Sequence, residues 1–174
     1  LTIAINISAF QFRRPGFVDR VHQVFADAGV SPQRFELELT ESALMQPSVE
    51  IEAQFTRLRR LGIGLALDDF GTGYSSLVYL KRLPITRLKI DRSFVQDLPG
   101  DAEDAAIATA TLSIARDLGL EVVAEGVETE AQRDFLLQRQ CPIMQGYLFA
   151  RPLRAADITA LLAASAEVGA SLKV

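Results

Sequence analysis

Six short apolar segments, rich in Ile, Leu and Val, recur along the 174-residue chain, and segments with helical periodicity lie between most of them. Apolar runs of this length predict parallel strands that are covered on both faces. The expected strands are residues 1–7, 35–39, 63–67, 87–90, 120–124 and 143–149. Strands that alternate with helices in one domain predict an α/β fold with a parallel sheet, either doubly wound or closed into a barrel.

Segments with helix-start signals separate these strands. Proline, serine, aspartate or threonine stands where each segment opens, and a glycine follows the last turn of three of them. The expected helices open at Pro15-Gly16, Pro47-Ser48, Asp101 and Thr129, and the first three end before Gly29, Gly62 and Gly119. No linker-like or low-complexity stretch divides the chain, so these units are expected to form one domain.

The chain contains a single cysteine, Cys141, and a single histidine, His22. Neither a disulfide framework nor a zinc site of Cys and His ligands can be built from one residue of each kind. A Ser-His-Asp triad would have to use His22, which lies in an amphipathic helical segment. A metal site must therefore be made of oxygen ligands, which favours Mg²⁺, Mn²⁺ or Ca²⁺.

The overall charge is slightly negative. The sequence has 18 Lys and Arg residues against 22 Asp and Glu residues, a formal net charge of −4. This balance supplies no global field for a nucleic-acid backbone, so no DNA or RNA polymer is expected as a partner. No stretch approaches the roughly 18 consecutive apolar residues that predict a membrane span.

An acid, amide or ammonium group stands at the carboxyl end of five of the expected strands and within the sixth. These residues are Asn6, Glu38, Glu41, Asp68, Asp69, Lys89, Asp91, Glu125, Glu128 and Gln145. The carboxyl ends of parallel strands converge on the site of chemistry in barrels and open sheets alike. The carboxylates and Lys89 together carry a formal charge of −6, which predicts one or two divalent cations. Taken singly, Glu41 or Asp91 could equally be the N-cap of the next helix.

A loop of small residues, Phe70-Gly71-Thr72-Gly73-Tyr74-Ser75-Ser76, follows the paired aspartates. Glycines let the backbone approach a ligand, and amides at a helix start favour phosphate oxygens. The alternative is a tight turn between strand and helix with no ligand. The loop lacks the Gly-Lys-Ser/Thr ending of a P-loop, which argues against nucleoside triphosphate binding by that route.

Six motifs then combine in one order along the chain. They are Asn6-Ile7-Ser8, Glu38-Leu39-Thr40-Glu41-Ser42, Asp68-Asp69-Phe70-Gly71-Thr72-Gly73-Tyr74-Ser75-Ser76, Lys89-Ile90-Asp91-Arg92-Ser93-Phe94, Glu125-Gly126-Val127-Glu128-Thr129 and Gln145-Gly146-Tyr147. In this order and spacing the chain resembles the EAL-domain cyclic di-GMP phosphodiesterases over essentially its whole length. The loop motif is the most specific of the six.

The resemblance implies a TIM-like (β/α) barrel that hydrolyses cyclic di-GMP to linear pGpG with Mg²⁺ or Mn²⁺, two divalent ions being expected. It implies metal-ligand roles for Asn6, Glu38, Asp68, Asp69, Asp91 and Glu125. It also implies catalytic roles for three residues: Glu125 as a metal ligand or general base, Lys89 orienting the attacking water, and Glu41 holding the loop in place. Substrate-binding roles fall to Gly71, Thr72, Gly73, Tyr74, Ser75, Glu128 and Gln145.

The Glu-Ala-Leu motif that names the family is absent from the sequence. Residues 1–174 are therefore expected to form the C-terminal three quarters of the domain, an incomplete barrel of about six strands whose first strand and helix lie upstream. The chain alone is expected to be weakly active or inactive. The resemblance further implies a homodimer, an upstream sensor or diguanylate-cyclase-type domain, and a cytoplasmic location with a possible upstream tether to the inner membrane.

Two other functions compete with this interpretation. A non-catalytic receptor for cyclic di-GMP would explain the absent glutamate, although every later motif is intact. A barrel lyase or aldolase would use Lys89 as a Schiff-base amine. A lysine beside so many acids should stay protonated, which is unfavourable for a nucleophilic amine.

Overall fold

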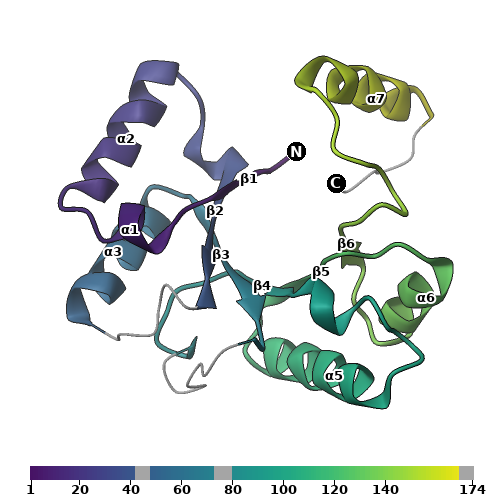
Figure 1. Cartoon of the computed structure of the whole chain (residues 1–174). Coiled ribbons are helices and arrows are strands. Elements are labelled where there is room, and N and C mark those ends of the chain that lie inside the picture. Colours follow the sequence, from purple (N-terminus) through teal and green to yellow (C-terminus); the bar gives the residue numbers. More distant parts are fainter. Residues whose placement is uncertain (42–47, 73–79, 169–174) are drawn as a thin grey trace.

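The computed structural model describes residues 1–41, 48–72 and 80–168, and its centre is a six-stranded parallel sheet. The strands lie in chain order and each pairs with the next. They are β1 (Ile3–Asn6), β2 (Phe35–Thr40), β3 (Gly64–Phe70), β4 (Arg87–Ile90), β5 (Glu121–Ala124) and β6 (Ile143–Met144). The six expected strands are confirmed, and the sheet curves into a half-barrel, as the TIM-like prediction requires (Figure 1).

Helices follow the strands and lie outside the curved sheet (Figure 1). They are α1 (Ala9–Phe12), α2 (Phe17–Ala28), α3 (Val49–Arg60), α5 (Ala102–Asp117), α6 (Glu130–Gln138) and α7 (Ala155–Val168), with short 3₁₀ turns η1 (Pro32–Arg34) and η3 (Arg92–Phe94). The predicted capping box is present at the start of α6, where Thr129 and Gln132 cap one another's backbone. Within the described part of the chain, no helix combines the length and apolar character that crossing a bilayer requires.

The central strands alternate between apolar and charged side chains, which corrects the prediction that both faces are apolar. Leu37 and Leu39 of β2 pack in one core cluster with Phe55 and Leu58 of α3. Glu36 and Glu38, which alternate with these leucines in sequence, are buried on the other face. The helices therefore cover one face of the sheet, and the opposite, inner face holds charged groups.

Strand β1 is exposed along its whole length, with Ile3 at 49% and Ile5 at 37% of full exposure. Among the described strands it pairs with β2 alone, as an edge strand of the sheet. None of the described elements packs over its outer side strongly enough to bury it, so the prediction of coverage on both faces is wrong for this strand too.

The last strand is shorter than predicted because β6 ends at Met144 rather than at residue 149. The chain turns there: the amides of Phe149 and Ala150 donate to the carbonyl of Gly146, at 3.1 and 3.3 Å. Gln145 consequently follows the strand instead of lying within it. Strand β3, in contrast, continues through Asp68 and Asp69 to Phe70.

Candidate metal centre and active site

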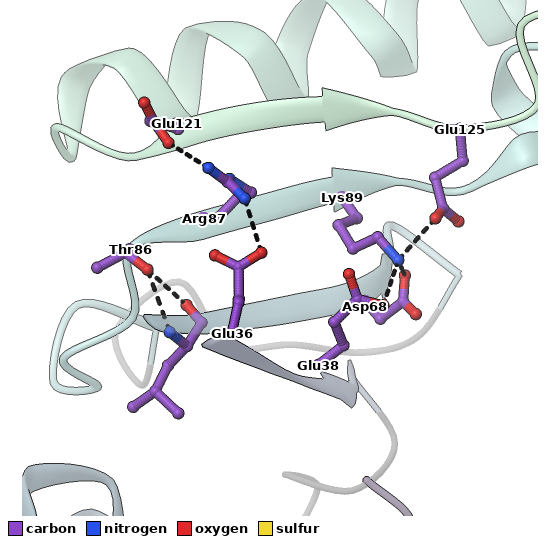
Figure 2. A network of polar contacts seen from close by, with 9 residues as sticks. Glu36, Glu38, Asp68, Thr86, Arg87, Lys89, Glu121 and Glu125 are labelled. Carbon is purple, nitrogen blue, oxygen red and sulfur yellow. Dashed lines mark hydrogen bonds and ion pairs between the residues drawn. The ribbon is translucent and has the colours of Figure 1, made fainter. Parts of the chain in front are cut away.

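The ammonium group of Lys89 is the centre of a buried polar cluster on the inner face of the sheet. Its Nζ lies 2.7 Å from Oε2 of Glu38, 3.1 Å from Oδ1 of Asp68 and 2.6 Å from Oε1 of Glu125 (Figure 2). The four side chains come from β2, β3, β4 and the residue after β5. An ammonium group has three N–H donors, and here each faces one carboxylate.

Burial makes this cluster electrostatically strong. The side chains of Lys89 and Glu38 are 5% and 7% exposed. Burial alone would lower the pKa of Lys89, but the hydrogen bonds and charges of Glu125 and Glu38 outweigh it, so the pKa lies above its usual value. Lys89 is therefore charged at neutral pH, which excludes its use as the free amine that a Schiff-base lyase needs.

Asp68 and Asp69 are consecutive, yet both face the same site. Ordinary strand alternation would send them to opposite faces of the sheet. The pairing between β3 and β4 shifts register between Leu67 and Phe70, and Asp69 has a positive φ of 55°. This irregularity re-aims one side chain, as β-bulges beside active sites commonly do.

The geometry of the acids fits a divalent cation. Carboxylate oxygens of Asp68, Asp69 and Glu125 all lie within 4.8 Å of one another. Burial, followed by the charges of Asp68 and Asp91, raises the pKa of Asp69, and burial raises that of Glu125. A bound cation would offset the repulsion between these clustered carboxylates. A set of oxygen donors suits Mg²⁺, Mn²⁺ or Ca²⁺.

Glu41 connects the end of β2 to the loop after β3. Its carboxylate Oε2 accepts a hydrogen bond of 3.1 Å from the amide of Gly71, and the residue is 2% exposed. Thr72 donates through Oγ1 to the carbonyl of Asp69 at 2.8 Å. Of the predicted loop residues, Gly73, Tyr74 and Ser75 lie outside the described residues.

The other predicted site residues lie around this cluster. Asp91 is the N-cap of η3 and accepts from the amide of Ser93 at 3.0 Å, so the capping alternative applies to it. Glu128 forms an exposed ion pair with Arg92, at 3.0 Å. Asn6, at the end of β1, is exposed and in register with Glu38, and Gln145 is an exposed residue directly after β6.

The motifs did not indicate a second layer of charges, which lies nearer the start of the same strands. Glu36 and Arg87 stand two residues before Glu38 and Lys89, and Glu121 is the first residue of β5. Nη1 of Arg87 is 2.7 Å from Oε1 of Glu36, and Nη2 is 2.6 Å from Oε2 of Glu121 (Figure 2). The sequence signal was the spacing of two in Glu36 and Glu38, repeated in Arg87 and Lys89. Residues two apart on a strand share a face.

Comparison with known proteins agrees with this geometry. Residues 1–152 match the model of the EAL domain family. The chain is 47% identical over 164 residues to the cyclic di-GMP phosphodiesterase NbdA of Pseudomonas aeruginosa, covering 94% of this chain and 21% of NbdA. It is 46% identical over 161 residues to the bifunctional diguanylate cyclase/cyclic di-GMP phosphodiesterase MucR of the same organism, covering 92% of this chain and 24% of MucR.

Solved structures share the fold. The PaMucR phosphodiesterase in its c-di-GMP complex has a TM-score of 0.87 at 46% identity, covering 90% of this chain and 64% of that one. The BlrP1 protein of Klebsiella pneumoniae, in a manganese and cy-diGMP complex, has a TM-score of 0.79 at 33% identity over 87% of this chain and 39% of that one. The chain thus spans less than a quarter of the two curated relatives' length.

Proposed function

The chain belongs to the EAL domain family, and on that premise we propose that, as part of the full-length protein, it hydrolyses one phosphodiester of cyclic di-GMP, giving linear pGpG, with Mg²⁺ or Mn²⁺ as cofactor. The observation that carries the proposal is the buried cluster of Lys89 with Glu38, Asp68 and Glu125, beside the carboxylate of Asp69. Relatives that are named as cyclic di-GMP phosphodiesterases support the substrate.

Asp68, Asp69 and Glu125 would hold a divalent ion, with Asn6, Glu38 and Asp91 as further oxygen ligands of a two-ion site. Such an ion lowers the pKa of water and offsets the negative charge of a phosphodiester. It also accounts for how an acidic cluster can accept an anionic substrate, since the ion reverses the sign of the local field.

The protein's own groups have separate tasks in this proposal. Lys89 holds Glu38 and Glu125 in place and presents a fixed positive charge that orients the attacking water. Glu125, with its raised pKa, is suited to take up the proton of that water. Glu41 fixes the amide of Gly71 and so holds the first residue of the loop after β3, and the motif residues Gly71, Thr72, Gly73, Tyr74 and Ser75 would bind the substrate.

The remaining elements of the proposal concern context. Glu128 and Gln145 support the substrate pocket, the domain acts as a homodimer, and an upstream sensor or cyclase-type domain regulates it. A cytoplasmic location is also part of the proposal, and the single free thiol of Cys141 gives no reason to expect an oxidising compartment.

The test is incubation of the full-length protein with cyclic di-GMP and Mn²⁺, followed by chromatography for pGpG. We expect turnover in the unmodified protein and a loss of at least about a hundredfold in Glu125→Gln and in Lys89→Met. Glu130→Gln, which changes a carboxylate that is 75% exposed, is the matched control and should retain activity. Binding of cyclic di-GMP without any pGpG would instead favour a receptor.

A further inference from the structure

The Arg87 guanidinium joins three strands at the level below the Lys89 cluster. Its two terminal nitrogens bond Glu36 of β2 and Glu121 of β5, while Arg87 itself belongs to β4. Lys89 repeats this pattern two residues further along, joining Glu38 of β2 to Glu125 after β5. Both cations of β4 therefore connect β2, which lies two strands away, with β5 or the residue directly after it.

Strand β3 lies between β2 and β4, and it carries small residues where the ion pair between Arg87 and Glu36 crosses it. Glu36 is in register with Gly64, and Arg87 with Ala66. A Cβ atom placed on Gly64 would lie 3.2 Å from Oε2 of Glu36 and 3.3 Å from its Cβ and Cγ. Small residues at these two positions leave the room that the carboxylate needs to reach across β3.

A contribution to stability does not by itself explain the ion pairs of Arg87 with Glu36 and Glu121. Glu36 is 4% exposed, and its burial is costly for a carboxylate. Nε of Arg87 is buried with no hydrogen-bond partner among the described residues. An apolar layer of similar volume would usually stabilise a sheet as well or better. A planar guanidinium with two separate nitrogens instead fixes the distance and direction between two carboxylates.

We propose that Arg87 is a positioning residue, whose contacts with Glu36 and Glu121 hold β2, β4 and β5 at the spacing that lets Lys89 reach Glu38 and Glu125. It acts through Lys89 and touches neither substrate nor metal. The inference rests on the proposed function only in its activity readout, because the geometry of the Lys89 cluster can be measured without turnover.

The experiment compares Arg87→Met and Arg87→Lys with the unmodified full-length protein. Arg154→Met, which breaks an ion pair at an arginine that is 88% exposed, is the control. The first readout is the ¹⁵N signal of the Lys89 ammonium in the metal-free protein, assigned with Lys89→Met. A buried ammonium held by carboxylates exchanges its protons slowly. We expect this signal to be lost in Arg87→Met and retained in Arg154→Met.

The second readout is Mn²⁺ affinity, followed by electron paramagnetic resonance, together with kcat and KM. We expect Arg87→Met to weaken Mn²⁺ binding by about tenfold and to lower kcat with little change in KM. Arg87→Lys should recover part of the affinity, because a lysine can contact one of the two carboxylates. An unchanged Lys89 signal and an unchanged Mn²⁺ affinity in Arg87→Met would overturn the proposal.

Glu121→Gln keeps the inference testable if Arg87→Met does not fold. Glu121 is 60% exposed, so its change should cost little stability while it weakens the β5 end of the contact. A weaker Lys89 signal and an affinity for Mn²⁺ that falls about threefold are expected. Wild-type values of both would again overturn the proposal. If the unmodified protein makes no pGpG, the proposed function fails while the Lys89 signal still decides the role of Arg87.

Discussion

Nζ of Lys89 lies 2.6 Å from Oε1 of Glu125, so the residue that follows β5 is held by the strand beside it. The same ammonium holds Glu38 and Asp68, whose side chains are 7% and 11% exposed. One cation thus offsets three carboxylates that have little contact with water. Removing it leaves their charges uncompensated, which is far more costly than removing an exposed ion pair.

We expect Lys89→Met to lower the free energy of unfolding by about 3 kcal/mol or more in metal-free buffer at neutral pH. Saturating Ca²⁺ should restore a large part of this loss, because a divalent ion then balances the carboxylates. Urea unfolding with and without Ca²⁺ measures both effects. Lys81→Met, at an exposed lysine, is the control and should change little. Equal losses in the two variants would contradict the central role of Lys89.

Asp69 provides a test of the metal site that does not depend on turnover. Its carboxylate lies with those of Asp68 and Glu125, so it should contribute directly to ion binding. At a Mn²⁺ concentration about one hundred times the Kd, the folded protein gains about 2.7 kcal/mol, which raises the melting temperature. Asp69→Asn should lose most of this increase. Asp134→Asn, at a carboxylate paired outside the site, should keep it in the same thermal scan.

Glu41 is expected to act by fixing the loop after β3. Its Oε2 accepts a hydrogen bond of 3.1 Å from the Gly71 amide. The side-chain oxygen of Gln could accept the same hydrogen bond, whereas Ala has no acceptor. Glu41→Ala should therefore speed hydrogen exchange at Gly71 and lower turnover by about tenfold or more. Glu41→Gln should fall between the alanine variant and the unmodified protein. Exchange at Gly71 that stays slow in Glu41→Ala would show that the loop is held in another way.

The sequence was sufficient to predict the strands and the convergence of most acids, because both follow from local patterns. Apolar runs gave the six strands, and the polar residues at their ends include Glu38, Asp68, Lys89 and Glu125, which the structure brings together. The register shift that turns both Asp68 and Asp69 toward this cluster depends on the pairing of β3 with β4. A pairing between distant segments leaves no local signal.

Two other features were missed for different reasons. The Arg87 layer had a signal, the repeated spacing of two, but its residues lie outside the six motifs, which begin at or after the residues Glu38 and Lys89 on these strands. The early end of β6 had none, since it depends on the approach of Gly146 to the backbone of Val127. For Asp91 the sequence left two roles open, and the structure shows one of them, the N-cap of η3, while its role as a metal ligand stays a prediction.

Gly146 is expected to tolerate no side chain. A Cβ atom there would lie 2.1 Å from the carbonyl oxygen and 2.4 Å from the amide nitrogen of Val127, and backbone atoms cannot move aside cheaply. Gly146→Ala should lower the free energy of unfolding by about 3 kcal/mol. Gly100→Ala is the matched control, because its nearest neighbour would be the Asp97 carbonyl oxygen at 3.4 Å. The control should lose no more than about 0.5 kcal/mol in the same urea titration.

Cys141 should make the stability of the protein depend on pH in the alkaline range. The residue is 1% exposed, and its Sγ lies 3.6 Å from the carbonyl oxygen of Ile143. Burial raises the pKa of the Cys141 thiol to about 11, above the value of about 8.5 for an unfolded chain. The folded state keeps its proton where the unfolded state loses it. The stabilising contribution is therefore complete below about pH 8.5 and is lost as the pH rises toward 11.

Replacing Cys141 with Ala removes this titration, and any packing loss it causes is the same at each pH. Between pH 8 and about pH 10.5, the unmodified protein should therefore lose about 2 kcal/mol more of its unfolding free energy than Cys141→Ala loses. Urea unfolding of both proteins in reducing buffer at the two pH values gives the number. A difference that stays constant would mean that the thiol ionises as easily in the folded protein as in the unfolded chain, and hence that water reaches it.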